Sequence, residues 1–193
     1  PGPAWALCEG GAVATNDPAD GLSTNAWAVL TLLVDDGPRH GFALAHELRR
    51  GGDIGRAWAV SRPLVYRALD QLEARGLVRA GPEEQSPAGP ARREYRATPA
   101  GRRAADRWRH TPVDHLRDVR PDLILKLTLN RRAGLDPAPL VAAQRDAFTS
   151  VLAEVADPDL SPENPRLVVD VWREELARAV DRTLSRVRDA GPS

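Results

Sequence analysis

Residues 61–80 read SRPLVYRALDQLEARGLVRA, and this stretch decides the fold. Ser61 is suited to cap a helix, and Pro63 is tolerated in the first turn because no backbone N–H donor is required there. Gly76 fits the position just after the last turn, and the β-compatible residues 77–79 follow it. Apolar residues recur at helical spacing between these two ends, at Leu64, Val65, Ala68, Leu69 and Leu72. The stretch therefore predicts a helix that leads directly into a short strand.

Two further helices are predicted upstream of residue 61. The first has Asn25 as its expected N-cap, carries apolar residues at helical spacing and stops at the Asp-Asp-Gly-Pro of 35–38. The second spans about 41–50 and ends at Gly51-Gly52. Residues 1–23 are rich in Gly, Ala, Pro and Asp and have no periodicity, so we expect a flexible arm.

Downstream of the strand, the sequence predicts a β-hairpin and a fourth helix. A loop rich in Pro, Gly and Ser over 81–91 separates the first strand from a second at 93–97. Thr98-Pro99 then opens a helix that runs to about Arg109. Three helices, a hairpin and a helix follow the order of a winged helix-turn-helix, which we assign to residues 24–110.

The remainder, residues 111–193, is predicted to be helical and to dimerise. Helices are expected over 113–132, from Asp136-Pro137 onwards, and over 165–187. The last carries one apolar stripe, made of Val168, Val171, Trp172, Leu176, Val180, Leu184 and Val187. Such a long stripe needs more partner surface than a small domain supplies, so a homodimer is expected. The fold class is mainly α with a small β-hairpin wing and a C-terminal helical dimerisation domain.

Charge and composition narrow the class of function. The chain has 27 Lys+Arg and 27 Asp+Glu, but residues 37–110 hold 15 arginines against 8 acidic residues. This excess indicates a module that binds a polyanion. There is one cysteine, no run of 18 apolar residues and no basic-then-apolar N-terminal segment, so we expect a cytoplasmic protein without disulfide, membrane span or signal peptide.

The candidate nucleic-acid contacts lie on the third helix and on the wing. In a winged helix-turn-helix the third helix enters the major groove of double-stranded DNA. Arginine can bind guanine through two hydrogen bonds, glutamine can pair with adenine, and hydroxyl groups can hold phosphates. The predicted contacts are Ser61, Arg62, Tyr66, Arg67 and Gln71 on the helix, with Arg92 and Arg93 on the wing.

Three ordered motifs in this region resemble the PadR-type transcriptional regulators. They are His40-Gly41-Phe42, the run from Ser61 to Leu69 with Leu72 and Gly76-Leu77-Val78, and the run Arg92–Gly101. Together they cover about residues 25–110, and 117–127 is similar to the start of the long C-terminal region of the larger subfamily. The resemblance implies a homodimeric, usually repressing DNA-binding protein. It also implies release by a small, often aromatic ligand. The two-fold symmetry of such a dimer predicts a pseudo-palindromic operator.

Two departures from the family pattern affect the expected contacts. Phe42 stands where the family usually has tyrosine, so a phosphate contact through that hydroxyl is lost. Glu83-Glu84 in the wing loop would repel phosphates, so we expect the base of the wing to bind DNA rather than its tip.

Other functions are less well supported by the sequence. Trp108 and Trp172 are candidate ligand contacts because flat indole faces suit aromatic ligands, although core packing explains them too. No phosphate loop, nucleophile elbow or Cys/His site is present, so we expect neither an enzyme nor a bound metal or cofactor. The alternative function is a winged-helix dimer that binds a protein or small molecule without recognising an operator.

Overall fold

The structure, a computed structural model, describes residues 17–86, 89–155, 159, 161 and 163–190. Most of the expected N-terminal arm, residues 1–16, lies outside this part. Residues 17–23 are packed on the first domain, contrary to the expectation of a flexible arm, because Ala19 is buried and Asp17 forms an ion pair with Arg107. Arg75 also donates a hydrogen bond to the Pro18 carbonyl oxygen.

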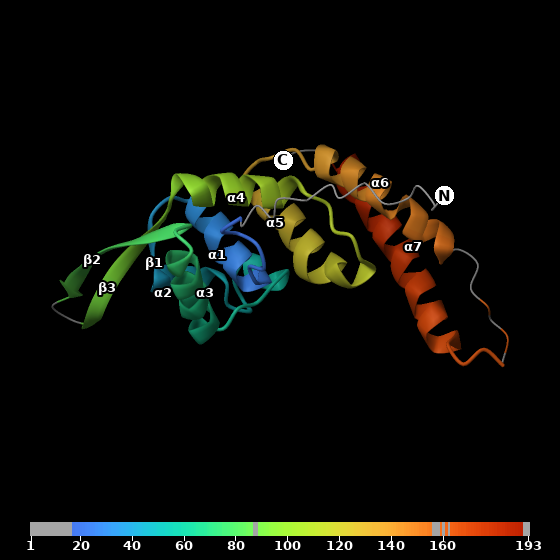
Figure 1. The fold of residues 1–193 in the computed structure, drawn as a ribbon, viewed down its shortest axis with the longest axis horizontal. Helices are drawn as coiled ribbons and strands as arrows, with labels where there is room; N and C mark the ends of the chain where they lie inside the picture. Colours follow the sequence, from blue (N-terminus) through green and yellow to red (C-terminus); the bar gives the residue numbers. More distant parts are fainter. Residues whose placement is uncertain (1–16, 87–88, 156–158, 160, 162, 191–193) are drawn as a thin grey trace, which may run out of the picture.

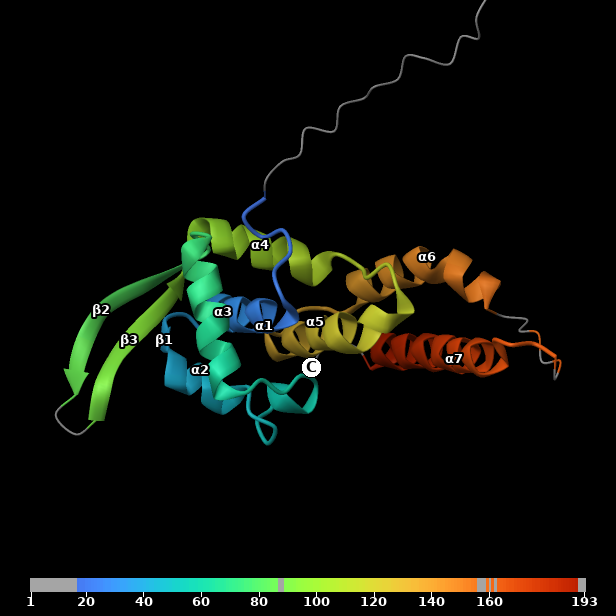
Figure 2. The same cartoon turned by 60° about the horizontal axis from the view of Figure 1, so that its bottom comes forward.

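The N-terminal half has the predicted order of three helices, a hairpin and a fourth helix (Figure 1). Its elements are α1 (Thr24–Asp35), β1 (Arg39–His40), α2 (Gly41–Glu47), the 3-10 turn η1 (Ile54–Arg56), α3 (Arg62–Ala74), β2 (Val78–Ser86), β3 (Gly89–Ala97) and α4 (Pro99–His110). The three strands form an antiparallel sheet in the order β1-β3-β2. The hairpin of β2 and β3 projects away from the helices as a wing (Figures 1 and 2).

The helix caps differ from the prediction at the start of α1. Ser23, not Asn25, is the N-cap, and its hydroxyl accepts a hydrogen bond from the Ala26 N–H group. The Asn25 Oδ1 atom instead accepts a hydrogen bond of 2.8 Å from the indole N–H of Trp58. Helix α2 ends at Glu47, three residues earlier than expected. The start of α3 is confirmed at Ser61, although its hydroxyl makes no capping hydrogen bond.

The wing is longer than the sequence suggested. Strands β2 and β3 continue into the stretch expected to be a loop, and β1, a strand of two residues, was not predicted. Irregular register between Ala80 and Glu83 accommodates Gly81 and Pro82 within β2. The hairpin tolerates Pro82 because the residues of a bulge are not paired in the ladder, so the N–H group that proline lacks is not required there.

Gly101 allows α4 to pack directly on the start of the wing. Thr98 caps α4 by accepting the Gly101 N–H, and a Cβ atom at residue 101 would lie 2.1 Å from the Leu77 carbonyl oxygen. Gly101→Ala should therefore lower the free energy of unfolding by about 1–3 kcal/mol, because the backbone of residue 77 must move. Urea unfolding measures this loss. Gly51→Ala is the control, since a Cβ there meets nothing within 4 Å; an equal loss in both variants would contradict the prediction.

The C-terminal half begins with an interrupted helix. The single helix expected over 113–132 is wrong: the chain forms η2 (Leu116–Asp118), a π-helical turn η3 (Val119–Leu123) and then α5 (Ile124–Arg132). Pro121 lies within η3 and cannot donate a backbone hydrogen bond, which explains the irregular turn. Two long helices follow, α6 (Ala138–Glu154) and α7 (Leu167–Asp189), and they lie side by side (Figure 1).

Helix α5 is shared between the two hydrophobic cores. Leu125 and Leu129 belong to the core of the N-terminal half, whereas Leu123 and Leu127 belong to the core formed with α6 and α7. Helix α5 follows the expected domain boundary at 110/111 in the sequence, but it packs against the residues on both sides of that boundary. Polar contacts strengthen this joint, because Arg132 forms ion pairs with Asp36 at 2.7 Å and with Glu47 at 2.6 Å.

Four of the seven residues of the apolar stripe on α7 pack inside the chain. Val180 and Leu184 are buried in the C-terminal core, and Leu176 and Val187 are partly buried against it. Val168, Val171 and Trp172 are exposed. In the same core Gln144 accepts the Val113 N–H at 2.7 Å and donates to the Val113 carbonyl at 2.8 Å, which fixes the connector to α6. No helix in the described part of the chain is both long and apolar enough to span a membrane.

Candidate nucleic-acid interface

The outer side of α3 carries the residues predicted to contact DNA. Val65, Ala68, Leu69 and Leu72 hold the helix on the core, as predicted, but Leu64, expected on that apolar face, is exposed. On the outer side Ser61, Arg62 and Arg67 are exposed, while Tyr66 and Gln71 are half-buried. The structure thus places all five predicted residues of this helix on or at the edge of one open surface.

An exposed aromatic group stands beside this surface at the start of α2. The Phe42 side chain is 61% exposed, and the Arg62 guanidinium lies 5.6 Å from its ring centroid and 5.8 Å from that of Tyr66. A Cβ atom on Gly41 would be 2.9 Å from Tyr66 Cε1, so the glycine allows α2 and α3 to approach closely. Stacking over two rings orients the Arg62 guanidinium without neutralising its charge.

Arg62 and Arg67 have no acidic partner in the part of the chain that the structure describes. No carboxylate oxygen lies within 4.0 Å of either guanidinium there, whereas Arg39, Arg109 and Arg132 are all held in ion pairs. The two unpaired arginines are therefore available to bind an anion. An exposed carboxylate, Asp70, lies further along the same helix.

Arg93 on the wing is less available than predicted. Arg93 lies 3.7 Å from Glu83 across the hairpin, and Arg92 is in register with Glu84, although the structure describes only the backbone of residues 84–86 and 89–92. The Glu83 carboxylate, which was predicted to repel phosphate, thus pairs with Arg93. Partial neutralisation weakens the attraction of Arg93 for phosphate.

Two arginines at the base of the wing were missed by the sequence analysis. Arg79 on β2 and Arg96 on β3 are directly opposite in register, and both are exposed. Arg96 forms an ion pair of 3.6 Å with Glu94, which partly neutralises it, whereas no carboxylate lies within 4.0 Å of Arg79 in the described part of the chain. Only the register, which the sequence did not define, would have identified this pair.

The interior of the wing base contains a buried tyrosine. Burial raises the pKa of the Tyr95 hydroxyl, and the nearby carboxylates of Asp70 and Glu73 raise it further. The carboxylate of Glu73 also accepts the Ala80 N–H at 3.2 Å. Glu73 thus connects α3 to the first strand of the wing.

The two tryptophans proposed as ligand contacts have different environments. Trp108 is only 9% exposed, stacks on Trp27 with ring centroids 5.2 Å apart, and has the Lys126 ammonium 5.1 Å from its centroid. Burial lowers the pKa of Lys126, which also donates a hydrogen bond to the Thr111 carbonyl. Trp108 therefore packs at the junction of the two halves, and its ligand role stays a prediction.

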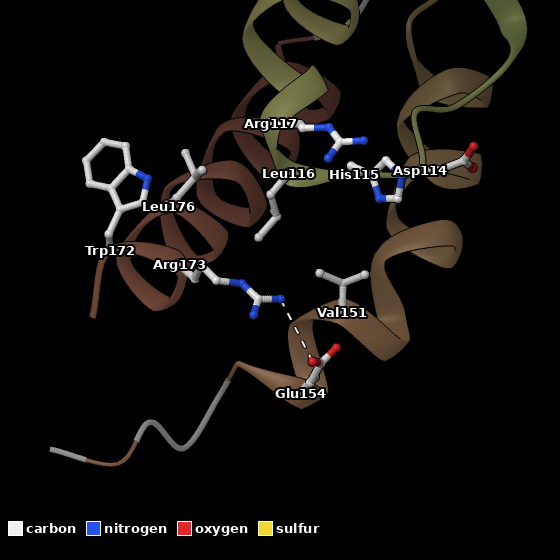
Figure 3. Close-up of a pocket in the computed structure, with 9 residues that line it drawn as sticks. All are labelled: Asp114, His115, Leu116, Arg117, Val151, Glu154, Trp172, Arg173 and Leu176. Atoms are coloured by element: carbon white, nitrogen blue, oxygen red, sulfur yellow. Dashed lines mark ion pairs between the residues drawn. The ribbon is translucent and has the colours of Figure 1, made fainter. Parts of the chain in front are cut away.

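Trp172 lies at the edge of a pocket of about 400 Å³ in the C-terminal half (Figure 3). The pocket is formed by the 114–117 connector, the end of α6 and the start of α7. Figure 3 shows the Arg173 guanidinium projecting into it towards Glu154, 3.9 Å away, while the indole of Trp172 points away from that ion pair. Trp172 is 65% exposed. Within the described residues no group of three or more His, Cys, Asp or Glu side chains could hold a metal ion.

The chain is similar to known proteins of one family. The model of the "Transcriptional regulator PadR-like family" matches residues 29–107. The chain is 40% identical over 84 residues to "Transcriptional regulator Rv3488" of Mycobacterium tuberculosis, a match that covers 44% of this chain and 72% of that protein. A solved structure, Bacillus subtilis PadR in complex with operator DNA, is 18% identical with a TM-score of 0.41, over 86% of this chain and 97% of the other. On the family model and the 40% identical relative, the chain belongs to the PadR-like family of transcriptional regulators.

Proposed function

We propose that the protein is a homodimer that regulates transcription by binding double-stranded DNA through α3 and the base of the wing. The observation that carries this proposal is the pair of unpaired arginines, Arg62 and Arg67, on the exposed side of the helix that a winged helix-turn-helix inserts into the major groove. Arg79 and Arg96 extend the positive surface to the wing. Gln71 and Ser61 supply further hydrogen-bonding groups at the edges of the same helix.

Binding to the protein's own promoter, measured by fluorescence anisotropy against unrelated competitor duplex, tests the proposal. Specific binding should weaken steeply with salt, since each neutralised phosphate releases counterions. Equally weak binding to every duplex would contradict operator recognition. It would instead favour the alternative, a winged-helix dimer that binds a protein or a small molecule.

Arg67→Ala tests the assignment of one base contact. The variant should weaken specific binding by about 1–3 kcal/mol if the guanidinium reads a base, and should also relax specificity at that position. Arg131→Ala is the matched control, because Arg131 is also exposed on a helix and has no carboxylate within 4.0 Å among the described residues. Unchanged affinity and specificity in Arg67→Ala would remove this residue from the interface.

The dimer is proposed to form through the exposed apolar part of α7. Val168, Val171 and Trp172 lie on the outside of this helix, and Leu176 continues the strip into an apolar groove of about 150 Å³ beside Ile124. A second copy of α7 suits this surface, because an isologous contact buries the same strip on both subunits. The two α3 helices would then meet half-sites of a pseudo-palindromic operator roughly 34 Å apart.

Repression with release by a small ligand completes the proposal. The pocket beside Trp172 lies between α6, α7 and the connector that precedes α5, so an occupant contacts the elements that set the dimer geometry. An aromatic ligand that stacks on the Trp172 indole competes with the second copy of α7 for that residue, and Arg173 can pair with the ligand only in place of Glu154. The ligand lowers DNA affinity only to the extent that it binds better to a dimer with mismatched spacing.

A further inference from the structure

A second pocket, of about 410 Å³, lies where the two halves of the chain meet. Arg50 and Arg56 line it from the segment between α2 and α3, and Arg120 lines it from η3 in the C-terminal half. Figure 2 shows the segment before α3 beside α5, at the end of α3 remote from the wing. The pocket is therefore separate from both the outer side of α3 and the pocket beside Trp172.

The charge of this pocket is positive and uncompensated. None of the residues that line it is acidic, and in the described parts of the chain none of its three guanidinium groups has a carboxylate within 4.0 Å. Elsewhere at the junction of the two halves, Arg39 and Arg132 are neutralised because they share Asp36 and Glu47. Arginine does not lose its proton in proteins, so three guanidinium groups around one cavity favour a bound anion.

The floor of the pocket is rigid and leaves room for a ligand. A Cβ atom on Gly55 would lie 1.8 Å from the Arg49 carbonyl oxygen, so only glycine fits where η1 crosses the end of α2. The indole N–H of Trp58 is fixed by Asn25 on α1 at 2.8 Å. Ala57 and Ala59 alternate with these residues and present methyl groups alone. A preorganised site loses little entropy when it binds a ligand.

We propose that this pocket binds a phosphate group held by Arg50, Arg56 and Arg120. Each guanidinium group can bind a phosphate through two charge-assisted hydrogen bonds, whereas a lysine ammonium acts only as a point charge. Three arginines around one cavity therefore suit a phosphate group. Arg120 lies outside the residues matched by the family model, so the bound phosphate would connect the C-terminal half to the segment that leads into α3.

Two sources of the phosphate share this chemistry. One is a free phosphate-bearing molecule. The other is a backbone phosphate of bound DNA beside the major groove, because five residues after Arg56 the chain reaches Ser61 and the N-terminus of α3. The first source is independent of the proposed function, and only the second rests on it.

The first arm of the test is thermal unfolding of the full chain in inorganic phosphate, balanced against chloride at constant ionic strength. The wild-type midpoint should rise by roughly 3 °C at a phosphate concentration ten times the dissociation constant. Arg120→Ala and Arg56→Ala should lose this rise, and Arg120→Lys should keep only part of it because the bidentate fork is lost. Arg131→Ala should keep it in full, and all four variants should unfold at the wild-type midpoint in chloride.

The second arm measures the salt dependence of DNA binding. If a DNA phosphate occupies the pocket, Arg120→Ala should reduce the slope of log K against log salt by about 0.9, with no change in Arg131→Ala. A lost phosphate effect with an unchanged slope identifies a free ligand as the source. A reduced slope without a phosphate effect identifies the DNA backbone.

Failure of the pocket and failure of the proposed function give different results. The phosphate pocket is overturned if Arg120→Ala and Arg56→Ala match Arg131→Ala in both arms. If the wild-type protein shows no salt-dependent DNA binding, the proposed function fails, and the unfolding arm alone decides whether the pocket binds phosphate.

Discussion

An Asp35→Ala variant is expected to lose about 3–5 kcal/mol of its free energy of unfolding. Asp35 at the end of α1 accepts a hydrogen bond of 2.6 Å from Arg109 at the end of α4, and Arg109 is only 5% exposed. Removal of the carboxylate leaves a guanidinium charge buried without a partner. Since single domains are stable by only about 5–15 kcal/mol, this loss would bring the winged helix close to unfolding at 25 °C.

Urea unfolding of the purified full chain measures this effect. Asp181→Ala is the matched control, because Asp181 also pairs with one arginine, Arg145, at 2.7 Å, but in a half-exposed position. The control should lose less than about 1 kcal/mol, as exposed ion pairs do. A loss in Asp35→Ala no larger than that in Asp181→Ala would show that Arg109 reaches water when its partner is removed.

The elements with a strong periodic pattern were predicted well from the sequence. Ser61 and Gly76 mark the two ends of α3 to within a residue, and the apolar spacing placed four of its five core residues correctly. Thr98-Pro99 defines the start of α4 in the same way. Local signals of this kind depend on backbone geometry alone, so they act without any knowledge of the tertiary contacts.

Features that depend on pairing could not be predicted. The β1 strand of two residues exists only because β3 lies beside it, and the opposition of Arg79 and Arg96 follows from a hairpin register that includes bulges. Likewise, nothing in the pattern around Arg93 shows that it lies opposite Glu83. The break in the helix expected over 113–132 is different, because the sequence contains its cause. Pro121 lies inside that range, and a proline inside a helix removes a hydrogen bond.

The stripe on α7 shows the limit of periodicity most clearly. Its spacing predicted one continuous buried face, but the spacing does not identify the partner that buries it. In the structure α6 and the connector cover Val180 and Leu184, while the first two turns of the helix extend beyond that cover. Only the exposed part, at Val168, Val171 and Trp172, is left for the proposed contact with a second copy.

The double variant Val168→Asp/Trp172→Asp should abolish the dimer and reduce operator affinity by about 10²–10⁴-fold. Val168 is 80% exposed, and the two residues lie one turn apart on the outside of α7, so the new charges would face each other across the proposed interface. The two monomers would then bind the half-sites independently, and the affinity gained by linking the two contacts in one dimer would be lost. Analytical ultracentrifugation measures the dimer, and fluorescence anisotropy measures the affinity.

Two comparisons separate lost dimerisation from other damage. Binding to a duplex with a single half-site should be unchanged in Val168→Asp/Trp172→Asp, because the surface of α3 is intact in each monomer. Ala142→Asp/Thr149→Asp adds the same two charges to exposed positions of α6 and should leave both the dimer and the operator affinity unchanged. A variant that remains dimeric would remove α7 from the interface. A monomeric variant with full operator affinity would instead show that one α3 helix with its wing is sufficient for recognition, since affinity would then owe nothing to the second half-site.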